Sequence, residues 1–131
     1  MISLLLFTAA ATVQPRPDCK NAMTQADMNI CSGLDASAAD AAMTRAYDRA
    51  AVLMRRMDRG LDRKSDKRIG YFQALLASQR SWLKYRDAEC LIERFSARGG
   101  SMEPLLANVC YEQLTKDRTK TLRTLLDSYS H

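Results

Sequence analysis

Residues 25–58 have the sequence QADMNICSGLDASAADAAMTRAYDRAAVLMRRMD, and the spacing of apolar side chains in this stretch decides the fold. Apolar residues recur at steps of three and four, which is the period of one face of an α-helix. They are Met28, Cys31, Leu34, Ala38, Ala42, Ala46, Tyr47, Ala50, Leu53, Met54 and Met57. Thr24 suits a helix start, Gly60 suits a helix end, and Gly33 allows a kink or break. We therefore predict one long helix over residues 25–58.

The same period predicts two further helices, over residues 67–98 and 102–128. The stripe of the second helix comprises Ile69, Phe72, Leu75, Leu76, Gln79, Trp82, Leu83, Arg86, Cys90 and Phe95. The stripe of the third helix comprises Leu105, Leu106, Val109, Cys110, Leu114, Leu122, Leu125, Leu126 and Tyr129. Ser101 can cap the third helix, and Pro104 is tolerated in its first turn. Residues 59–67 are polar and form a loop, so short connections predict an all-α, antiparallel three-helix bundle.

Length and composition agree with a single folded helical domain. The chain has 131 residues, which is enough for one hydrophobic core but not for two. Hydrophobic residues make up 47% of the chain and there are only 5 Gly and 3 Pro, which excludes collagen-like and disordered classes. Aromatic residues, which favour strands, make up only 7%, whereas helix formers are plentiful.

The four cysteines indicate disulfide bonds and an oxidising compartment, because their number is even and the domain is small. Three connectivities are possible, and we favour the one that joins residues close in sequence, Cys19 with Cys31 and Cys90 with Cys110. In the predicted hairpin, Cys90 and Cys110 lie about 12 Å and about 9 Å from the turn, so they face each other. A zinc site is the alternative, but the spacings contain no C-x2-4-C pair and the only histidine is His131. We expect no metal and no cofactor.

The N-terminal residues predict export. Residues 2–12 form an apolar run, far shorter than the roughly 18 to 20 residues that a membrane-spanning helix requires. An A-x-A pattern at residues 9–11 precedes a polar segment, as at a signal peptidase site. We predict a signal peptide over residues 1–14, followed by one domain over residues 15–131 in a periplasmic or secreted protein. An apolar arm packed on the domain is the alternative. Because no lipobox precedes Cys19, no lipid anchor is expected.

The chain contains two distinctive motifs. The first is CKNAMTQADMNIC at residues 19–31, and the second is QRSWLKYRDAEC at residues 79–90. They continue into the Gly-Gly-Ser-Met stretch at residues 99–102 and the regularly spaced leucines of residues 114–126. This combination resembles the LprI-type lysozyme inhibitor family of small exported bacterial proteins. The resemblance implies a helical, disulfide-bonded protein that binds a lysozyme-type muramidase and blocks its cleft without catalysis.

Four residues are candidates for partner binding. Blocking a concave cleft needs a protruding segment, and the connector Gly99–Glu103 is the best candidate because the second predicted disulfide would hold it rigid. We expect Ser101 and Glu103 to contact the partner there. Trp82 and Arg86 lie four residues apart on one helix face, so the guanidinium can lie on the indole and the pair can anchor a partner. A purely structural role is the alternative for both pairs.

Other charged residues favour structural roles over catalysis. Asp87 and Glu89 are two residues apart, so they point to different faces and do not form a glycosidase-like pair. We expect no enzyme activity, and an uncharacterised hydrolase is the least favoured alternative. Arg118 interrupts the apolar stripe of the third helix, and a half-buried arginine needs a carboxylate. We predict that Asp87 or Asp40 supplies it and links two helices.

Charge is distributed unevenly along the chain. Residues 18–44 carry one basic and four acidic groups, net −3, whereas residues 45–68 carry nine basic and four acidic groups, net +5. An alternative function follows, in which residues 45–68 bind an anionic envelope polymer or a protein. A solvated loop is the structural interpretation of the same residues. The overall charge of +5 would also suit nucleic acid, but predicted export and the lack of a basic, aromatic reading surface oppose this partner.

Overall fold

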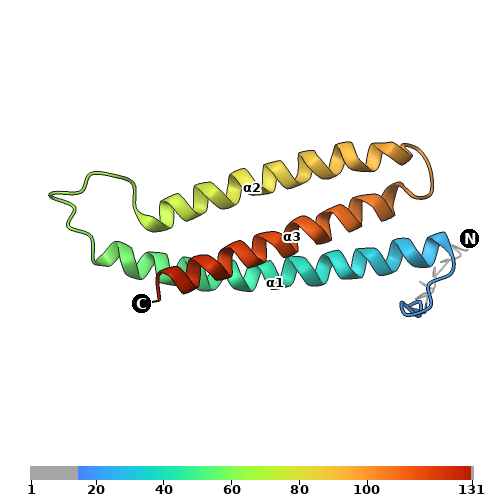
Figure 1. Cartoon of the computed structure of the whole chain (residues 1–131), viewed down its shortest axis with the longest axis horizontal. Coiled ribbons are helices and arrows are strands. Elements are labelled where there is room, and N and C mark those ends of the chain that lie inside the picture. Colours follow the sequence, from blue (N-terminus) through green and yellow to red (C-terminus); the bar gives the residue numbers. More distant parts are fainter. Residues whose placement is uncertain (1–14, 131) are drawn as a thin grey trace, which may run out of the picture.

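The computed structural model describes residues 15–130, which form three helices joined by two connections (Figure 1). The helices are α1 (Gln25–Arg59), α2 (Tyr71–Arg94) and α3 (Glu103–Ser128), with a short 3₁₀ helix, η1 (Phe95–Ala97), after α2. α2 runs antiparallel to its two neighbours. The predicted all-α three-helix bundle is confirmed, and the described part of the chain contains no strand. The predicted signal peptide lies outside the described residues.

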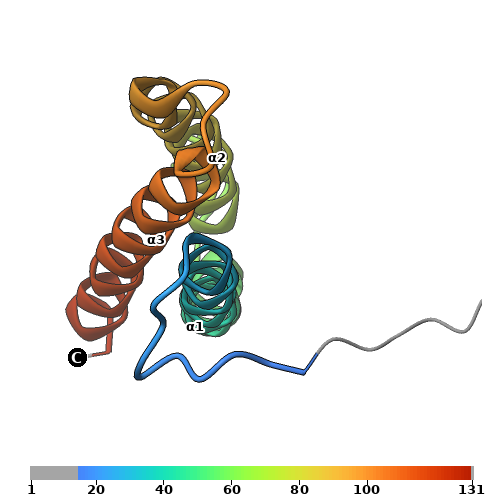
Figure 2. The same cartoon turned by 90° about the vertical axis from the view of Figure 1, so that its right-hand side faces the viewer.

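The bundle is long and narrow, with different structures at its two ends (Figures 1 and 2). α3 packs against both other helices, and most closely against α1. The α1–α2 loop and the end of α3 lie at one end, which we call the loop end. The α2–α3 connection and the start of α1 lie at the other, which we call the tip end. None of the helices in residues 15–130 is long and apolar enough to cross a membrane.

The core forms where small side chains on α1 allow the other helices to approach closely. Ala46, Ala50 and Ala51 are at most 5% exposed. They pack with two buried methionines of the same helix and with Leu75 of α2 and Leu122 of α3. Since alanine carries no atoms beyond Cβ, these positions bring the helix backbones together rather than filling space. Much of the predicted apolar stripes meets in this core, but Ala38, Ile69 and Val109 are exposed, and the buried Met43 and Ala51 lie outside the predicted stripe.

α1 follows the prediction for residues 25–58 closely. The Thr24 hydroxyl accepts a hydrogen bond of 3.0 Å from the backbone N–H of Asp27, which confirms the predicted cap. The helix continues through Gly33 without a break. A Cβ at Gly33 would lie 3.4 Å from the side-chain amide of Asn108, so Gly33 faces α3 in close contact.

α2 begins at Tyr71, four residues later than the predicted start at residue 67. The Asp58 carboxylate accepts hydrogen bonds from the backbone N–H groups of Tyr71 at 2.6 Å and Phe72 at 3.1 Å. These two groups have no partner within the helix, so the carboxylate fixes where α2 starts. At its other end α2 stops at Arg94 and continues as η1, which accounts for the predicted end at residue 98.

α3 begins at Glu103, and the prediction that Ser101 caps it is wrong. The capping position is Met102, which makes no side-chain capping bond. Pro104 lies in the first turn, as predicted. The Ser101 backbone carbonyl instead accepts a hydrogen bond from Asn29 of α1, because the connection folds back onto that helix.

Both predicted disulfide bonds are present, Cys19–Cys31 and Cys90–Cys110, and no cysteine is free. The Cα–Cα distance is 5.5 Å in each. Cys90–Cys110 is buried between α2 and α3 and ties the hairpin together. Cys19–Cys31 fixes the segment before α1 to the first turns of that helix.

Candidate functional site

The α2–α3 connection, residues 95–103, forms a compact tip, and the carboxylate of Glu103 closes it. One carboxylate oxygen accepts a hydrogen bond of 2.8 Å from the Arg94 guanidinium, and the other accepts one of 2.8 Å from the backbone N–H of Gly99. Gly99 has φ of +77°, a conformation that favours glycine. The hydrogen bond from Gly99, and then that from Arg94, lower the pKa of Glu103. This carboxylate therefore holds both ends of the tip in one geometry.

A second set of hydrogen bonds ties the tip to the start of α1. The side-chain amide of Asn29 donates to the Ser101 carbonyl at 2.9 Å. The side-chain amide of Asn108 on α3 donates to the Asn29 carbonyl at 3.2 Å and to the Ser32 hydroxyl at 3.1 Å. No local sequence pattern indicates a role for Asn108, because its partners lie more than seventy residues away. Asn29 lies in the motif of residues 19–31, and this motif is the sequence feature that could have indicated the contact.

The tip presents only some of its side chains to solvent. Ser101 is exposed and the Met102 side chain is 47% exposed. The Glu103 side chain is only 19% exposed and is engaged within the tip. Of the two residues predicted to contact a partner here, Ser101 is therefore accessible, whereas Glu103 supports the backbone beneath it.

The Trp82 and Arg86 pair forms a separate cluster that joins all three helices. The Arg86 guanidinium contacts Asp40 of α1 at 3.1 Å, Asp87 at 3.2 Å and the Thr115 hydroxyl of α3 at 3.3 Å. Its carbon Cζ lies 5.1 Å from the centroid of Trp82, so the predicted stacking is confirmed. The Arg86 side chain is 15% exposed. It thus connects helices inside the molecule and offers little surface.

Arg118 has partners different from those predicted. Its Nε donates to the Gln79 side-chain oxygen at 2.9 Å and its Nη2 donates to the Ser78 hydroxyl at 3.1 Å. Arg118 thus links α3 to α2, but through neutral groups. The predicted pairing with Asp87 or Asp40 is wrong, because both carboxylates bind Arg86.

The tip and the arginine cluster lie far apart. Along α2 and α3, Trp82 and Glu103 lie on opposite sides of the Cys90–Cys110 bridge, about 20 Å from each other at 1.5 Å per residue. The structure therefore does not combine the four predicted partner-binding residues into one surface. The tip is the more accessible of the two sites.

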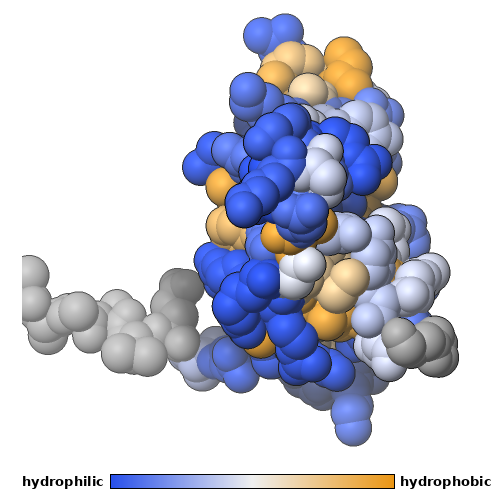
Figure 3. Space-filling view, turned by 90° about the vertical axis from the view of Figure 1, so that its left-hand side faces the viewer, coloured by the Kyte–Doolittle hydropathy of each residue, from blue (hydrophilic) through white to orange (hydrophobic). Residues whose placement is uncertain are grey.

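The loop end carries exposed positive charge. The acidic side chains in the α1–α2 loop are used locally: Asp62 accepts hydrogen bonds from Ser65 and the Lys64 backbone, and Asp66 binds Arg68. The hydrogen bond from Arg68 is the main reason that the pKa of Asp66 falls to about 2. Hydrophilic residues cover much of this end of the molecule (Figure 3). The local bonds leave several basic side chains pointing outwards, Lys64 among them.

Comparison with known proteins assigns the chain to a family. The family described as "Lysozyme inhibitor LprI" matches residues 17–122. The chain belongs to the LprI family. It is also 42% identical over 126 residues to an uncharacterized protein of Rhizobium meliloti (strain 1021), which covers 95% of this chain and 91% of that protein. No solved structure matches the chain significantly.

The LprI match covers the features that define the tip. Residues 17–122 include both disulfide bonds, Asn29, Asn108 and the Glu103 carboxylate. The family is named for inhibition and not for catalysis. Within residues 15–130, no group of three or more His, Cys, Asp or Glu side chains is placed to hold a metal ion.

Proposed function

We propose that this LprI-family protein is an exported inhibitor that binds a lysozyme-type muramidase and blocks its cleft with the tip. The observation that carries this proposal is the bracing of the tip by three sets of bonds: the Cys90–Cys110 bridge, the Glu103 carboxylate and the Asn29 amide. A segment that is already ordered loses less entropy when it binds. The two disulfide bonds support a periplasmic or secreted location, because such bonds persist in oxidising compartments.

The proposed contact surface consists of the Gly100 backbone and the Ser101 and Met102 side chains. Met102 is a flexible apolar side chain that is 47% exposed in the tip. Glu103 acts as a positioning residue beneath them. Inhibition then needs only steric and polar complementarity to a concave cleft, and no chemical step. A direct partner contact by Trp82 and Arg86 remains a prediction.

The test is a peptidoglycan lysis assay with the purified, oxidised protein titrated against c-type, g-type and i-type lysozymes. Saturable inhibition of at least one class supports the proposal, and a reduced and alkylated sample should lose the effect. Met102→Arg should weaken inhibition by about tenfold or more, since it places bulk and charge at the centre of the contact. Val52→Arg is the matched control, because Val52 is 62% exposed on α1 and far from the tip. No inhibition of any class, or equal loss in both variants, would contradict the proposal.

A second candidate function places binding at the loop end. The loop aspartates Asp62 and Asp66 are used in local hydrogen bonds, and exposed basic side chains of residues 45–68 such as Lys64 remain available for an anionic envelope polymer. Binding of dextran sulfate as a model polymer should fall steeply between low and high salt, because exposed charges are screened within about 8 Å at physiological ionic strength. Lys64→Glu should weaken this binding and leave lysozyme inhibition unchanged. Salt-independent binding would exclude this candidate.

A further inference from the structure

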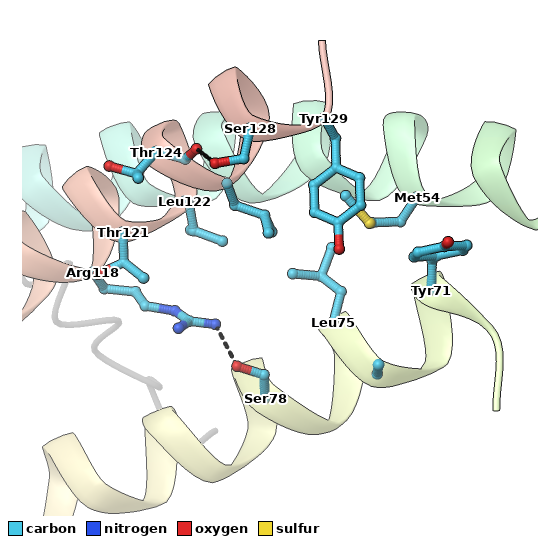
Figure 4. Close-up of a pocket in the computed structure, with 12 residues that line it drawn as sticks. Met54, Tyr71, Leu75, Ser78, Arg118, Thr121, Leu122, Thr124, Ser128 and Tyr129 are labelled. Atoms are coloured by element: carbon cyan, nitrogen blue, oxygen red, sulfur yellow. Dashed lines mark hydrogen bonds between the residues drawn. The ribbon is translucent and has the colours of Figure 1, made fainter. Parts of the chain in front are cut away.

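A groove opens between α2 and α3 near the loop end, away from the tip (Figure 4). Its volume is about 460 Å³, within the range of small-molecule sites. The floor consists of the core side chains Met54, Leu75 and Leu122, which are at most 6% exposed. The α2 rim carries the small residues Ala74 and Ser78, so no large side chain closes the groove between Leu75 and Arg118. The groove is therefore a largely apolar channel that is open to solvent.

The two ends of the groove differ chemically. At one end, the rings of Tyr71 and Tyr129 meet edge to face with their centroids 5.8 Å apart. At the other end, Arg118 reaches across from α3 to Ser78 (Figure 4). Arg118 lies on α3 and Tyr129 directly follows that helix, eleven residues later. This separation corresponds to about 16 Å along the helix axis. A positive charge and an aromatic pair thus stand at opposite ends of an apolar channel.

The charge of Arg118 has no anionic partner among residues 15–130. Its two hydrogen bonds go to neutral oxygens, of Gln79 and Ser78, and no salt bridge involves it. Partial burial lowers its pKa. The third guanidinium nitrogen of Arg118, Nη1, makes no hydrogen bond within these residues. Every buried side-chain nitrogen there has a hydrogen-bond partner, so Nη1 is not buried and is accessible to solvent. A half-buried guanidinium of this kind gains more from an added anion than a fully hydrated one does.

We propose that this groove binds a single-chain amphiphile with an anionic head group, such as a fatty acid. The carboxylate accepts hydrogen bonds from the Arg118 guanidinium, whose planar fork suits carboxylate and phosphate oxygens. The alkyl chain runs along the groove towards the two tyrosines and covers apolar side chains that are exposed or half-buried at its rim, Ala74, Leu125 and Tyr129. This site does not depend on the lysozyme-binding function proposed for the tip.

The only tryptophan of the chain provides a direct readout. The Trp82 ring centroid lies 5.8 Å from the Arg118 carbon Cζ, so an anion at Arg118 should change the indole fluorescence. We would titrate the oxidised protein with dodecanoate below its micelle concentration, and confirm the stoichiometry by calorimetry. Dodecyl phosphate distinguishes a phosphate from a carboxylate head, and dodecyltrimethylammonium controls for the chain alone. We expect saturable one-to-one binding of an anionic ligand and at least about tenfold weaker binding of the cationic one.

Variants localise the binding. Arg118→Gln should weaken dodecanoate binding by at least about tenfold, whereas Arg123→Gln, an exposed arginine that does not line this groove, should leave it unchanged. Ala74→Phe fills the groove from its exposed rim and should abolish binding without disturbing the core, which keeps the test decisive if Arg118→Gln misfolds. Met102→Arg at the tip should have no effect on dodecanoate binding.

Four results would overturn the proposal. The first is no saturable binding of either anionic ligand. The second is equal affinity for the cationic ligand, and the third is binding that Ala74→Phe leaves intact. The fourth is sedimentation showing a dimer that Ala74→Phe dissociates, because the groove would then hold a second copy of the chain.

Discussion

The carboxylate of Asp58, near the end of α1, accepts a 2.6 Å hydrogen bond from the backbone N–H of Tyr71 at the start of α2. It also accepts one from the next residue of α2, at 3.1 Å. Gly70 occupies the capping position of α2 and has no side chain to bond these groups. One helix therefore caps the next across a loop, and this contact fixes the geometry of the loop end.

This contact predicts opposite effects for two glycines in the same loop. A Cβ at Gly70 would lie 2.6 Å from the Asp58 carboxylate oxygen, so Gly70→Ala displaces the cap. We expect a loss of about 1 kcal/mol in the free energy of unfolding, the usual effect of losing a helix cap. At Gly60 the nearest atom would be 3.5 Å away, and φ is −87°. Gly60→Ala should therefore be neutral or add about 0.4 to 1 kcal/mol.

Urea unfolding followed by circular dichroism measures both effects. Asp58→Ala should resemble Gly70→Ala, and the double variant should lose little more than either single variant, because all of them remove one cap. If the two glycine variants had equal stability, the Asp58 cap would not be a determinant of stability.

A second prediction concerns Arg86, which joins the three helices. Arg86→Ala removes bonds to Asp40 and Thr115 and leaves them without this partner. We expect a loss of about 2 kcal/mol in the free energy of unfolding, typical for a charged hydrogen-bonding group in a half-buried site. Arg80→Ala, on the exposed side of α2, should change it by less than about 0.5 kcal/mol. Thermal and urea unfolding compare the pair, and similar losses would show that Arg86 is not the link.

The cluster around Arg86 shows how far the sequence alone can predict this protein. Helical periodicity is a local property, so the three helices and their buried faces could be predicted from residue spacing. The stacking of Arg86 on Trp82 is also local, since it spans one helical turn. Which arginine binds Asp40 is different, because it depends on how α1, α2 and α3 are shifted along their axes. Residue spacing gives the face of a helix but not this shift, so it does not decide whether Arg86 or Arg118 binds Asp40.

The boundaries and the tip show the same limit. The start of α2 depends on Asp58, thirteen residues earlier, and a spacing argument considers only the residues next to a helix. Ser101 has a good capping side chain, but the connection folds back so that its carbonyl meets Asn29. The disulfide bonds could be predicted because the hairpin places Cys90 and Cys110 at similar distances from the turn.

A third prediction concerns the Cys90–Cys110 bridge. It joins residues 20 apart in sequence, and closing a loop of this length should stabilise the fold by about 3 kcal/mol. Replacing both cysteines with alanine should therefore lower the free energy of unfolding by about that amount and increase hydrogen exchange throughout the tip. The Cys19–Cys31 double alanine variant is the comparison, because it should loosen residues 15–24 and leave the tip ordered. Equal exchange in the tip of both variants would show that the Cys90–Cys110 bridge does not brace it.

The fourth prediction is an acid-induced loosening of the tip. The Gly99 and Arg94 hydrogen bonds hold the folded-state pKa of Glu103 below its ordinary value of 4.5. A carboxylate with a lowered pKa stabilises the fold fully above the unfolded-state value, and this contribution is lost as the pH falls through the folded-state value. Protection of the Gly99 amide against hydrogen exchange should therefore be high at neutral pH and fall below about pH 4.5. Glu103→Ala removes the acceptor and should give low protection at every pH, and Arg94→Gln should raise the pKa of Glu103, measured by NMR titration of its side chain. Protection of Gly99 that is independent of pH would show that the carboxylate does not close the tip.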